Sequence, residues 1–141
     1  MKEKLFKIIY NHFPESNNDA DNWKLVLNNS NSNISFYHLL NMVHYYVAYH
    51  SEEGAFDLSI VVYENKQPVG VMPLMAHKHK QNGWILSSNG KNIVDPVFIN
   101  SLTTKTKKRL EKNLVDLVYD LANQLNIKQC QFVNIQYFKL S

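Results

Sequence analysis

The sequence has few of the residues that place a chain among secreted, membrane or disordered proteins. One cysteine, Cys130, cannot form an internal disulfide, which fits a reducing cytoplasm. No apolar run approaches the ~18 residues of a membrane span, and residues 1–5 lack a signal-peptide core. Only 19% of the residues are charged, which excludes a disordered chain. We therefore expect a cytoplasmic protein without a membrane span.

Glycine is also scarce, and the charge balance is modest. With four glycines, the chain has no glycine-rich phosphate-binding loop. Fifteen Lys and Arg against twelve Asp and Glu leave a net charge of +3, which is too small to indicate specific nucleic-acid binding. The 45% of hydrophobic residues suffice for a buried core, and 141 residues are the length of one domain, spanning 1–141.

The first third of the chain is expected to form two helices. Apolar residues at helical spacing predict a short helix over residues 4–12. Residues 23–27 fit either a short strand or a packed turn. Ser35 is a plausible N-cap for an amphipathic helix over residues 36–50.

The middle of the chain predicts a three-strand meander. Residues 56–63 and 68–75 form a hairpin, with pairing interrupted at Pro73 because proline has no backbone donor. A turn over residues 77–83 leads to the third strand, residues 83–88.

The last third predicts a loop over residues 89–101, a long helix from Thr104, and a strand over residues 127–137. A strand that returns after a crossover helix is expected to run parallel to a neighbour. The fold class is therefore α+β, with a mixed sheet of about four to five strands and helices on both faces.

A basic cluster marks the first turns of the long helix. Cations there oppose the helix dipole, so helix stability does not explain them. Free backbone N–H groups and lysines together can bind a phosphate. A solvated basic face is the alternative, and the missing glycine loop favours it. The cluster comprises Lys105, Lys107, Lys108, Arg109 and Lys112, with hydroxyls from Thr103, Thr104 and Thr106.

Histidines offer two further candidate sites. His77 and His79 lie two apart, so in a strand both imidazoles face one metal, but a solvated hairpin tip is the simpler interpretation. His44 and His50 with Glu52, Glu53 and Asp57 provide acid–base groups, against the alternative of helix-surface histidines beside a solvated acidic turn. Neither set has the spacing of a complete site, and we expect no metal.

Three other features have simple structural interpretations. Asp95 before Pro96 is expected mainly to form a turn, and a catalytic carboxylate is the less favoured interpretation. Cys130 fits a small apolar residue in a sheet. The aromatic residues fit a core and a subunit interface better than base or sugar stacking. They are Tyr37, Tyr45, Tyr46, Tyr49, Tyr63, Trp84 and Phe98.

A set of motifs in order resembles the first half of the FemAB-like acyltransferases. The set begins with Trp23, the helix start Ser35-Phe36-Tyr37 and the strand 56–63. It continues with residues 67–74, in which Gly70 and Pro73-Leu74 match the family pattern Val-Gly-x-x-Pro-Leu, and with residues 84–90. The family includes the CelD/BcsL-type group of bacterial surface-polysaccharide pathways and belongs to the GNAT superfamily.

The chain departs from that family in two ways. Enzymes of the superfamily that use acyl-coenzyme A carry a glycine-bearing turn before the long helix, whereas residues 100–105 contain no glycine. FemAB-like proteins also have two such domains in tandem, about twice this length. The resemblance therefore implies the first half of such an enzyme.

The resemblance implies an N-acyltransferase acting on an amine of a peptidoglycan or surface-polysaccharide precursor. An acyl-coenzyme A or aminoacyl donor would be a co-substrate, with no tightly bound cofactor. Candidate donor-binding residues are Thr104, Lys105, Lys107, Lys108 and Arg109, and Asp95 is the candidate catalytic residue. The alternative is a non-catalytic binding or assembly module. It would pair as a homodimer, or with a second GNAT-like domain, through the edge strand Gln131–Phe138.

Overall fold

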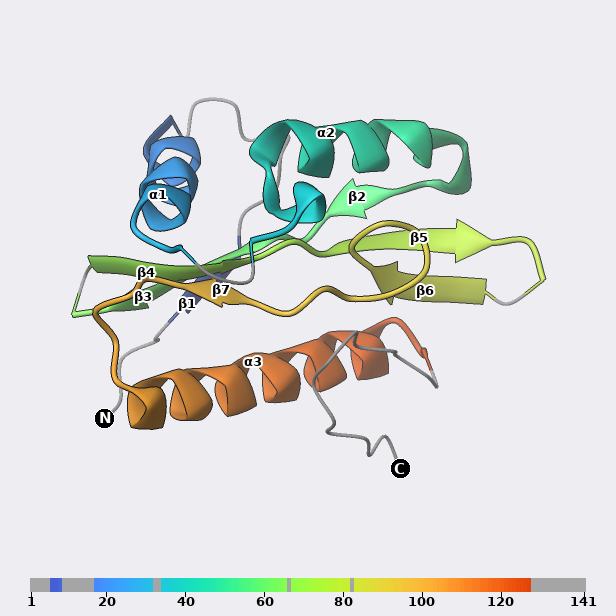
Figure 1. Ribbon diagram of the computed structural model, residues 1–141. Coiled ribbons are helices and arrows are strands. Elements are labelled where there is room, and N and C mark those ends of the chain that lie inside the picture. The colour runs from blue at the N-terminus through green and yellow to red at the C-terminus, as the bar shows by residue number, and fades with distance from the viewer. Residues whose placement is uncertain (1–5, 9–16, 32–33, 66, 82, 128–141) are drawn as a thin grey trace.

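A computed structural model describes residues 6–8, 17–31, 34–65, 67–81 and 83–127 of the chain. Its described elements form three layers (Figure 1). Antiparallel strands make the middle layer. Helices α1 (Asn17–Asn28) and α2 (Leu40–Tyr49) cover one face, and α3 (Thr104–Gln124) covers the other. This arrangement confirms the α+β class with helices on both faces.

The strands pair as two sheets, and every described pair is antiparallel. The four-stranded sheet has the order β1-β3-β4-β7, and the three-stranded sheet has the order β2-β5-β6. The strands are β1 (Phe6–Ile8), β2 (Phe56–Asp57), β3 (Ile60–Glu64), β4 (Gln67–Met72), β5 (Met75–His79), β6 (Gly83–Ser87) and β7 (Val97–Phe98).

The two sheets are continuous through a bend in one long hairpin. β2 leads into β3, and β4 leads into β5, with the interruption at Ser59 opposite Pro73 and Leu74. The N–H of Leu58 donates to the Leu74 carbonyl at 2.8 Å, and the N–H of Leu74 donates to Oγ of Ser59 at 3.1 Å. These bonds replace the ladder that Pro73 cannot complete, as its missing N–H predicts.

The third strand of the meander is interrupted by an excursion over residues 88–96. β6 pairs with β5, and β7 resumes beside β4. Ser88 closes the base of this excursion, because its Oγ donates to the Pro73 carbonyl at 2.7 Å and accepts from the N–H of Val94 at 2.9 Å. The loop predicted for residues 89–101 therefore contains a strand, β7.

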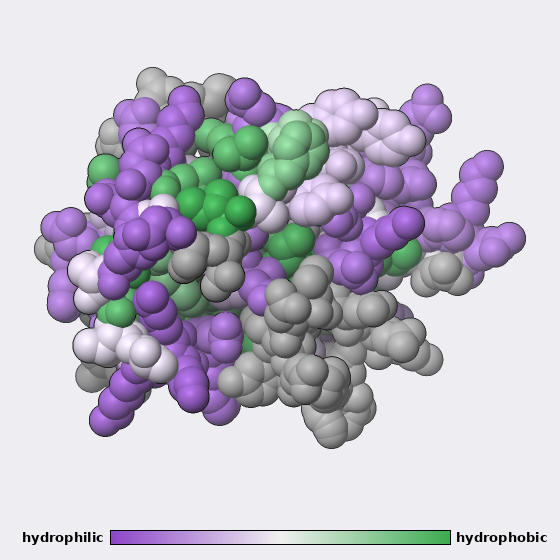
Figure 2. Space-filling model, viewed as in Figure 1, coloured by the Kyte–Doolittle hydropathy of each residue, from purple (hydrophilic) through white to green (hydrophobic). Residues whose placement is uncertain are grey.

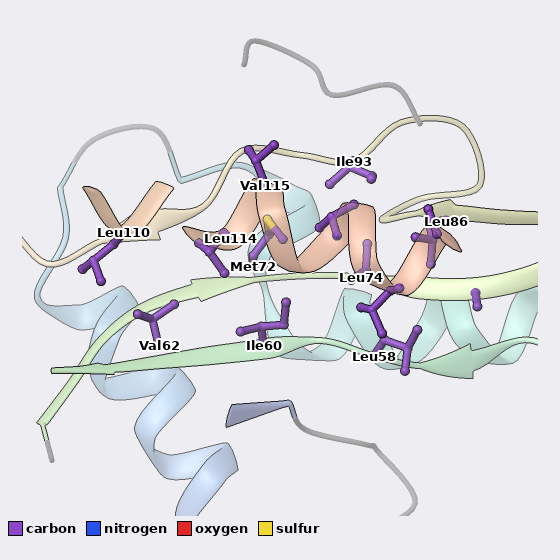
Figure 3. Packing of buried hydrophobic residues seen from close by; sticks show 14 of the residues in the cluster. Leu58, Ile60, Val62, Met72, Leu74, Leu86, Ile93, Leu110, Leu114 and Val115 are labelled. Carbon is purple, nitrogen blue, oxygen red and sulfur yellow. The ribbon is translucent and has the colours of Figure 1, made fainter. Parts of the chain in front are cut away.

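The larger core lies between the sheet and α3. Ile60 and Val62 of β3 and Met72 of β4 face Leu110 and Leu114 of α3 (Figure 3). Ile93 from the excursion joins the same cluster and is fully buried. The predicted long helix is confirmed, since α3 begins at Thr104 as expected; it buries Leu110, Leu114, Val118 and Leu121.

The second core lies between the sheet and the other two helices. Val61 and Val71 alternate with the residues that face α3, because successive strand side chains point to opposite faces. They pack against Trp23 and Val26 of α1 and Val43 of α2. Both faces of β3 and β4 are therefore apolar, as expected for central strands.

Two predictions for the N-terminal third are wrong. Residues 6–8 form β1, which pairs with β3, rather than part of a helix over 4–12. A segment this short is compatible with both helical and strand periodicity. It forms a strand because it pairs with the edge of β3. Residues 23–27 lie in helix α1 rather than in a strand or turn. Trp23 and Val26 are three apart and both buried, which is helical spacing.

Two further predictions are correct in outline and wrong in detail. Ser35 is a cap, but it caps the short 3-10 helix η1 (Phe36–His38), and extended backbone at Leu39 separates η1 from α2. The turn expected over residues 77–83 is shorter, because β5 continues to His79. The hairpin is confirmed, and Asn65 adopts the left-handed conformation in its turn.

The parallel strand of the expected mixed sheet is the one predicted over residues 127–137, which lies outside the described residues except for Ile127. All described strand pairs are antiparallel, in sheets of four and three strands. Ile127 is buried beyond the end of α3 and is not in a strand. The remainder of the predicted strand 127–137, the edge Gln131–Phe138 and Cys130 lie outside the described residues. None of the described helices is long and apolar enough to cross a membrane.

Candidate functional site

At the start of α3, the basic residues that are clustered in the sequence have different partners and surroundings. Thr103 caps the helix, with its Oγ1 accepting from the N–H of Thr106 at 3.1 Å. Arg109 binds Oε2 of Glu64, at the end of β3, at 2.6 Å. Lys112 pairs with Asp116 one turn along at 3.5 Å. Arg109 is therefore engaged with the sheet, whereas Lys105 and Lys108 are exposed.

Asp95, the predicted catalytic candidate, lies near a carboxyl group that the sequence did not single out. Burial and then the charge of Asp95 raise the pKa of Glu111 in α3, and Lys108 partly offsets the rise. Asp95 also holds the excursion to η1, since its carbonyl accepts from Nε2 of His38 at 2.7 Å. A carboxyl group with a raised pKa beside a second carboxylate is a combination typical of acid–base sites.

A second polar cluster lies where α2 ends above the sheet. Nδ1 of His50 and Nδ1 of His77 lie 2.8 and 3.0 Å from the same atom, Oε1 of Glu53. The two imidazole centroids are 4.7 Å apart, with 33° between the ring planes. Nε2 of His77 lies 3.1 Å from Oγ of Ser87, which accepts from the N–H of Gly90 at 2.9 Å. We refer to His50, Glu53, His77 and Ser87 as the histidine cluster.

Local structure explains why these residues meet. His50 is the C-cap of α2, and the 3-10 helix η2 (Ser51–Glu53) that follows carries Glu53. On the strands, His77 is opposite Ile85, so Ser87 is the diagonal neighbour and points to the same face. Gly90 lies against His50, and a Cβ there would meet Nε2 of His50 at 2.7 Å. The absent side chain leaves room for that ring.

The environment fixes the protonation states within the histidine cluster. Hydrogen bonds from His50 and His77 lower the pKa of Glu53, with burial opposing them. Burial lowers the pKa of His77, and the bond to Glu53 only partly offsets this. Because an ionised carboxylate can only accept, both imidazoles present N–H at Nδ1 to Glu53. At neutral pH the cluster therefore contains a carboxylate and a neutral His77.

The order Ser87–His77–Glu53 has the connectivity of a serine-nucleophile triad, but burial excludes that chemistry. In a triad, Nε2 of the histidine contacts the hydroxyl and Nδ1 contacts the carboxylate, as here. Ser87 has no exposed surface, and its oxygen already accepts from Gly90. A substrate carbonyl cannot reach that atom, so Ser87 holds His77 in place instead.

The histidines therefore meet partners other than those expected from the sequence. His77 is not at a solvated tip but 2% exposed, and it meets His50 and Glu53 rather than His79. His79 is half-buried at the end of β5, and its Nδ1 accepts from the N–H of Gln81 at 3.2 Å. Of the second predicted set, His50 and Glu53 meet, whereas His44 and Glu52 remain exposed. Asp57 is buried and accepts from the N–H of Ser59.

Comparison of the chain with known proteins gave no significant match to a family model, a curated protein or a solved structure. A function for this chain must therefore follow from its own residues and geometry.

Proposed function

We propose that the chain is the first half of a FemAB-like acyltransferase of the GNAT superfamily. Its substrate would be an amine of a peptidoglycan or surface-polysaccharide precursor. The observation that carries the proposal is the layered arrangement. A meander of bent strands lies between α1 and α2 on one face and α3 on the other, in the order that the motif resemblance implies.

The motif residues occupy positions that explain their identities. A Cβ on Gly70 would lie 2.6 Å from Cδ1 of Phe98, so glycine is needed where β4 and β7 meet. Pro73 and Leu74 lie at the bend of the long hairpin, where the Pro73 carbonyl accepts from Ser88. The short motif therefore corresponds to a close contact between two strands followed by a bend in the hairpin. This supports the resemblance to the FemAB-like family.

The chemistry would be direct attack of the substrate amine on a thioester or aminoacyl ester. The attacking nitrogen loses a proton to a base as the new C–N bond forms and the thiol or alcohol leaves. Glu111 is the base favoured by its surroundings, because burial and Asp95 raise its pKa toward the working range of a base. Lys108, with Thr104, Lys105 and Lys107, would attract the anionic part of the donor.

The first test is thermal melting with and without millimolar acetyl-coenzyme A at low and high salt. A ligand at 100 times its Kd stabilises a protein by about 2.7 kcal/mol, which is a measurable shift. We expect a shift that persists at high salt and is reduced in a Lys105→Ala/Lys108→Ala variant. Lys24→Ala is the matched control, since Lys24 is an exposed lysine on α1. Absence of any shift would contradict donor binding by this chain.

An assembly module is the second candidate function, and one observation favours it. Apolar and aromatic side chains are exposed over η1 and α2, where Figure 2 shows green and near-white side chains together. They include Phe36 at 56%, Leu39 at 44%, Tyr45 at 51% and Tyr49 at 67% exposure. Exposed apolar surface of this kind marks interaction sites. Dimer formation by light scattering without any response to acetyl-coenzyme A would favour this candidate.

A further inference from the structure

We propose that His50, Glu53 and His77 form a binding site for a zinc-type divalent cation, independently of any acyltransferase activity. Three ligand atoms converge from three elements: the end of α2, η2 and β5. Nδ1 of His50 and Nδ1 of His77 both contact Oε1 of Glu53, and one ligand atom from each of the three residues lies within 4.8 Å of the other two.

The spacing of these atoms is close to that of a tetrahedral metal site. Two ligands about 2.1 Å from a tetrahedral zinc lie about 3.4 Å apart. The two Nδ1 atoms lie 2.8 and 3.0 Å from Oε1 of Glu53. An opening of about half an ångström along these two separations would admit the ion, with the ring proton of each histidine moving from Nδ1 to Nε2.

The donor set selects the class of metal. Two imidazoles and one carboxylate suit zinc and neighbouring transition metals, whereas Ca²⁺ and Mg²⁺ take oxygen ligands. Three protein ligands leave a fourth position for water or another ligand, as in open zinc sites. Glu53 is 38% exposed and the His50 side chain 15%, so the approach to the site is from the Glu53 side.

A supporting shell is already in place around the three ligands. When a metal takes Nδ1 of His77, the ring proton moves to Nε2, where Oγ of Ser87 accepts it at 3.1 Å. Ligating histidines usually donate their second N–H in this way, which fixes the ring. Gly90 contributes by leaving space beside the His50 ring and by donating its N–H to Ser87. The shell thus holds both rings in the orientation that the metal requires.

The test is a titration of chelator-treated protein with zinc alone, followed by calorimetry, and with Co²⁺ alone, followed by its visible absorption. We expect one ion per chain and a four-coordinate Co²⁺ spectrum. Glu53→Gln and His50→Gln should each weaken binding by at least about 100-fold, the upper end of what loss of a supporting residue costs. Both positions retain exposed surface, and circular dichroism would verify that the variants fold.

Matched variants separate this site from non-specific binding. Glu52→Gln and His79→Gln remove the same side-chain types from neighbouring positions outside the cluster and should leave zinc affinity unchanged. Failure of the wild-type chain to bind zinc would overturn the proposal. So would unchanged affinity in Glu53→Gln, or loss of binding in His79→Gln, which would assign the ion to His79 at the end of β5.

Discussion

His38 shows how much of the fold can depend on one side chain that sequence patterns do not mark. It is 2% exposed, its Nδ1 accepts from the N–H of Ser35 at 2.9 Å, and its Nε2 donates to the Asp95 carbonyl at 2.7 Å. Its own carbonyl accepts from Nε1 of Trp23 at 2.8 Å. One residue therefore joins α1, η1 and the excursion over residues 88–96, and its ring fits there only when neutral.

Acid should destabilise the protein through His38. Burial lowers its pKa below the ordinary 6.5, although Asp95 and Ser35 partly offset this. The unfolded chain therefore binds the proton more tightly, so the stability contributed by neutral His38 is complete above about pH 6.5 and is lost as the pH falls below it. The slope from one such group is at most about 1.4 kcal/mol per pH unit.

Urea unfolding at several values between about pH 7.5 and 5 measures this slope. His77, whose pKa is also lowered, contributes in the same direction, so the comparison must use variants. We expect His38→Gln to flatten the pH dependence and His44→Gln, at an exposed position, to leave it unchanged. An identical slope in wild type and His38→Gln would contradict the assignment.

The candidate sites show which parts of a site can be predicted from individual residues in the sequence. The individual histidines and Asp95 are visible as candidates from their chemistry. Their partners are not, because Glu53 and His77 are 24 positions apart and meet only through the path of the strands. Pairing His77 with His79 by strand alternation puts both on one face, yet β5 buries His77 and leaves His79 near its end, beside a turn.

At the scale of elements, periodicity predicts the long and regular parts best. Helix α3 and the hairpin of β3 and β4 follow from apolar spacing and turn residues. Helix α1 does not, since its first turns are mostly asparagine and aspartate, and Trp23 and Val26, its buried residues among the side chains that the structure describes, lie in its second half. Packing against Val61 and Val71 stabilises a helix whose composition is unfavourable.

The N-cap of α3 provides a test at this scale. Thr103 is extended, at φ −71° and ψ 159°, and its hydroxyl accepts from the N–H of Thr106. Thr103→Ala should lower the free energy of unfolding by about 1 kcal/mol, because one N–H at the helix start loses its partner. Thr103→Ser keeps the acceptor and should change stability little. Chemical denaturation of both variants measures the difference, and equal losses would contradict a capping role.

At the scale of the whole molecule, one pair of strands connects two cores. β3 and β4 present Ile60 and Met72 to α3 and present Val61 and Val71 to α1 and α2. The two cores should therefore form and melt together, as small domains usually do.

Leu114→Ala tests that coupling from the α3 side. Leu114 is 1% exposed, and its truncation should cost about 2–5 kcal/mol, as buried Leu→Ala changes do. In a Trp84→Phe background, fluorescence reports on Trp23, which lies in the opposite core. We expect its transition to move by the same amount as the transition followed by circular dichroism. A Trp23 signal that persists after helicity is lost would show two independent units.

The excursion over residues 88–96 has a consequence for how the protein could diversify. Its base is fixed by Ser88 and by buried Ile93, while Asn89, Gly90 and Lys91 form its tip. The N–H groups of Lys91 and Asn92 donate to the side chain of Asn89, so the tip closes upon itself. Substitutions in the tip would alter the surroundings of His50 without disturbing strand register. Descendants of this chain could thus acquire different ligand preferences while inheriting the same scaffold.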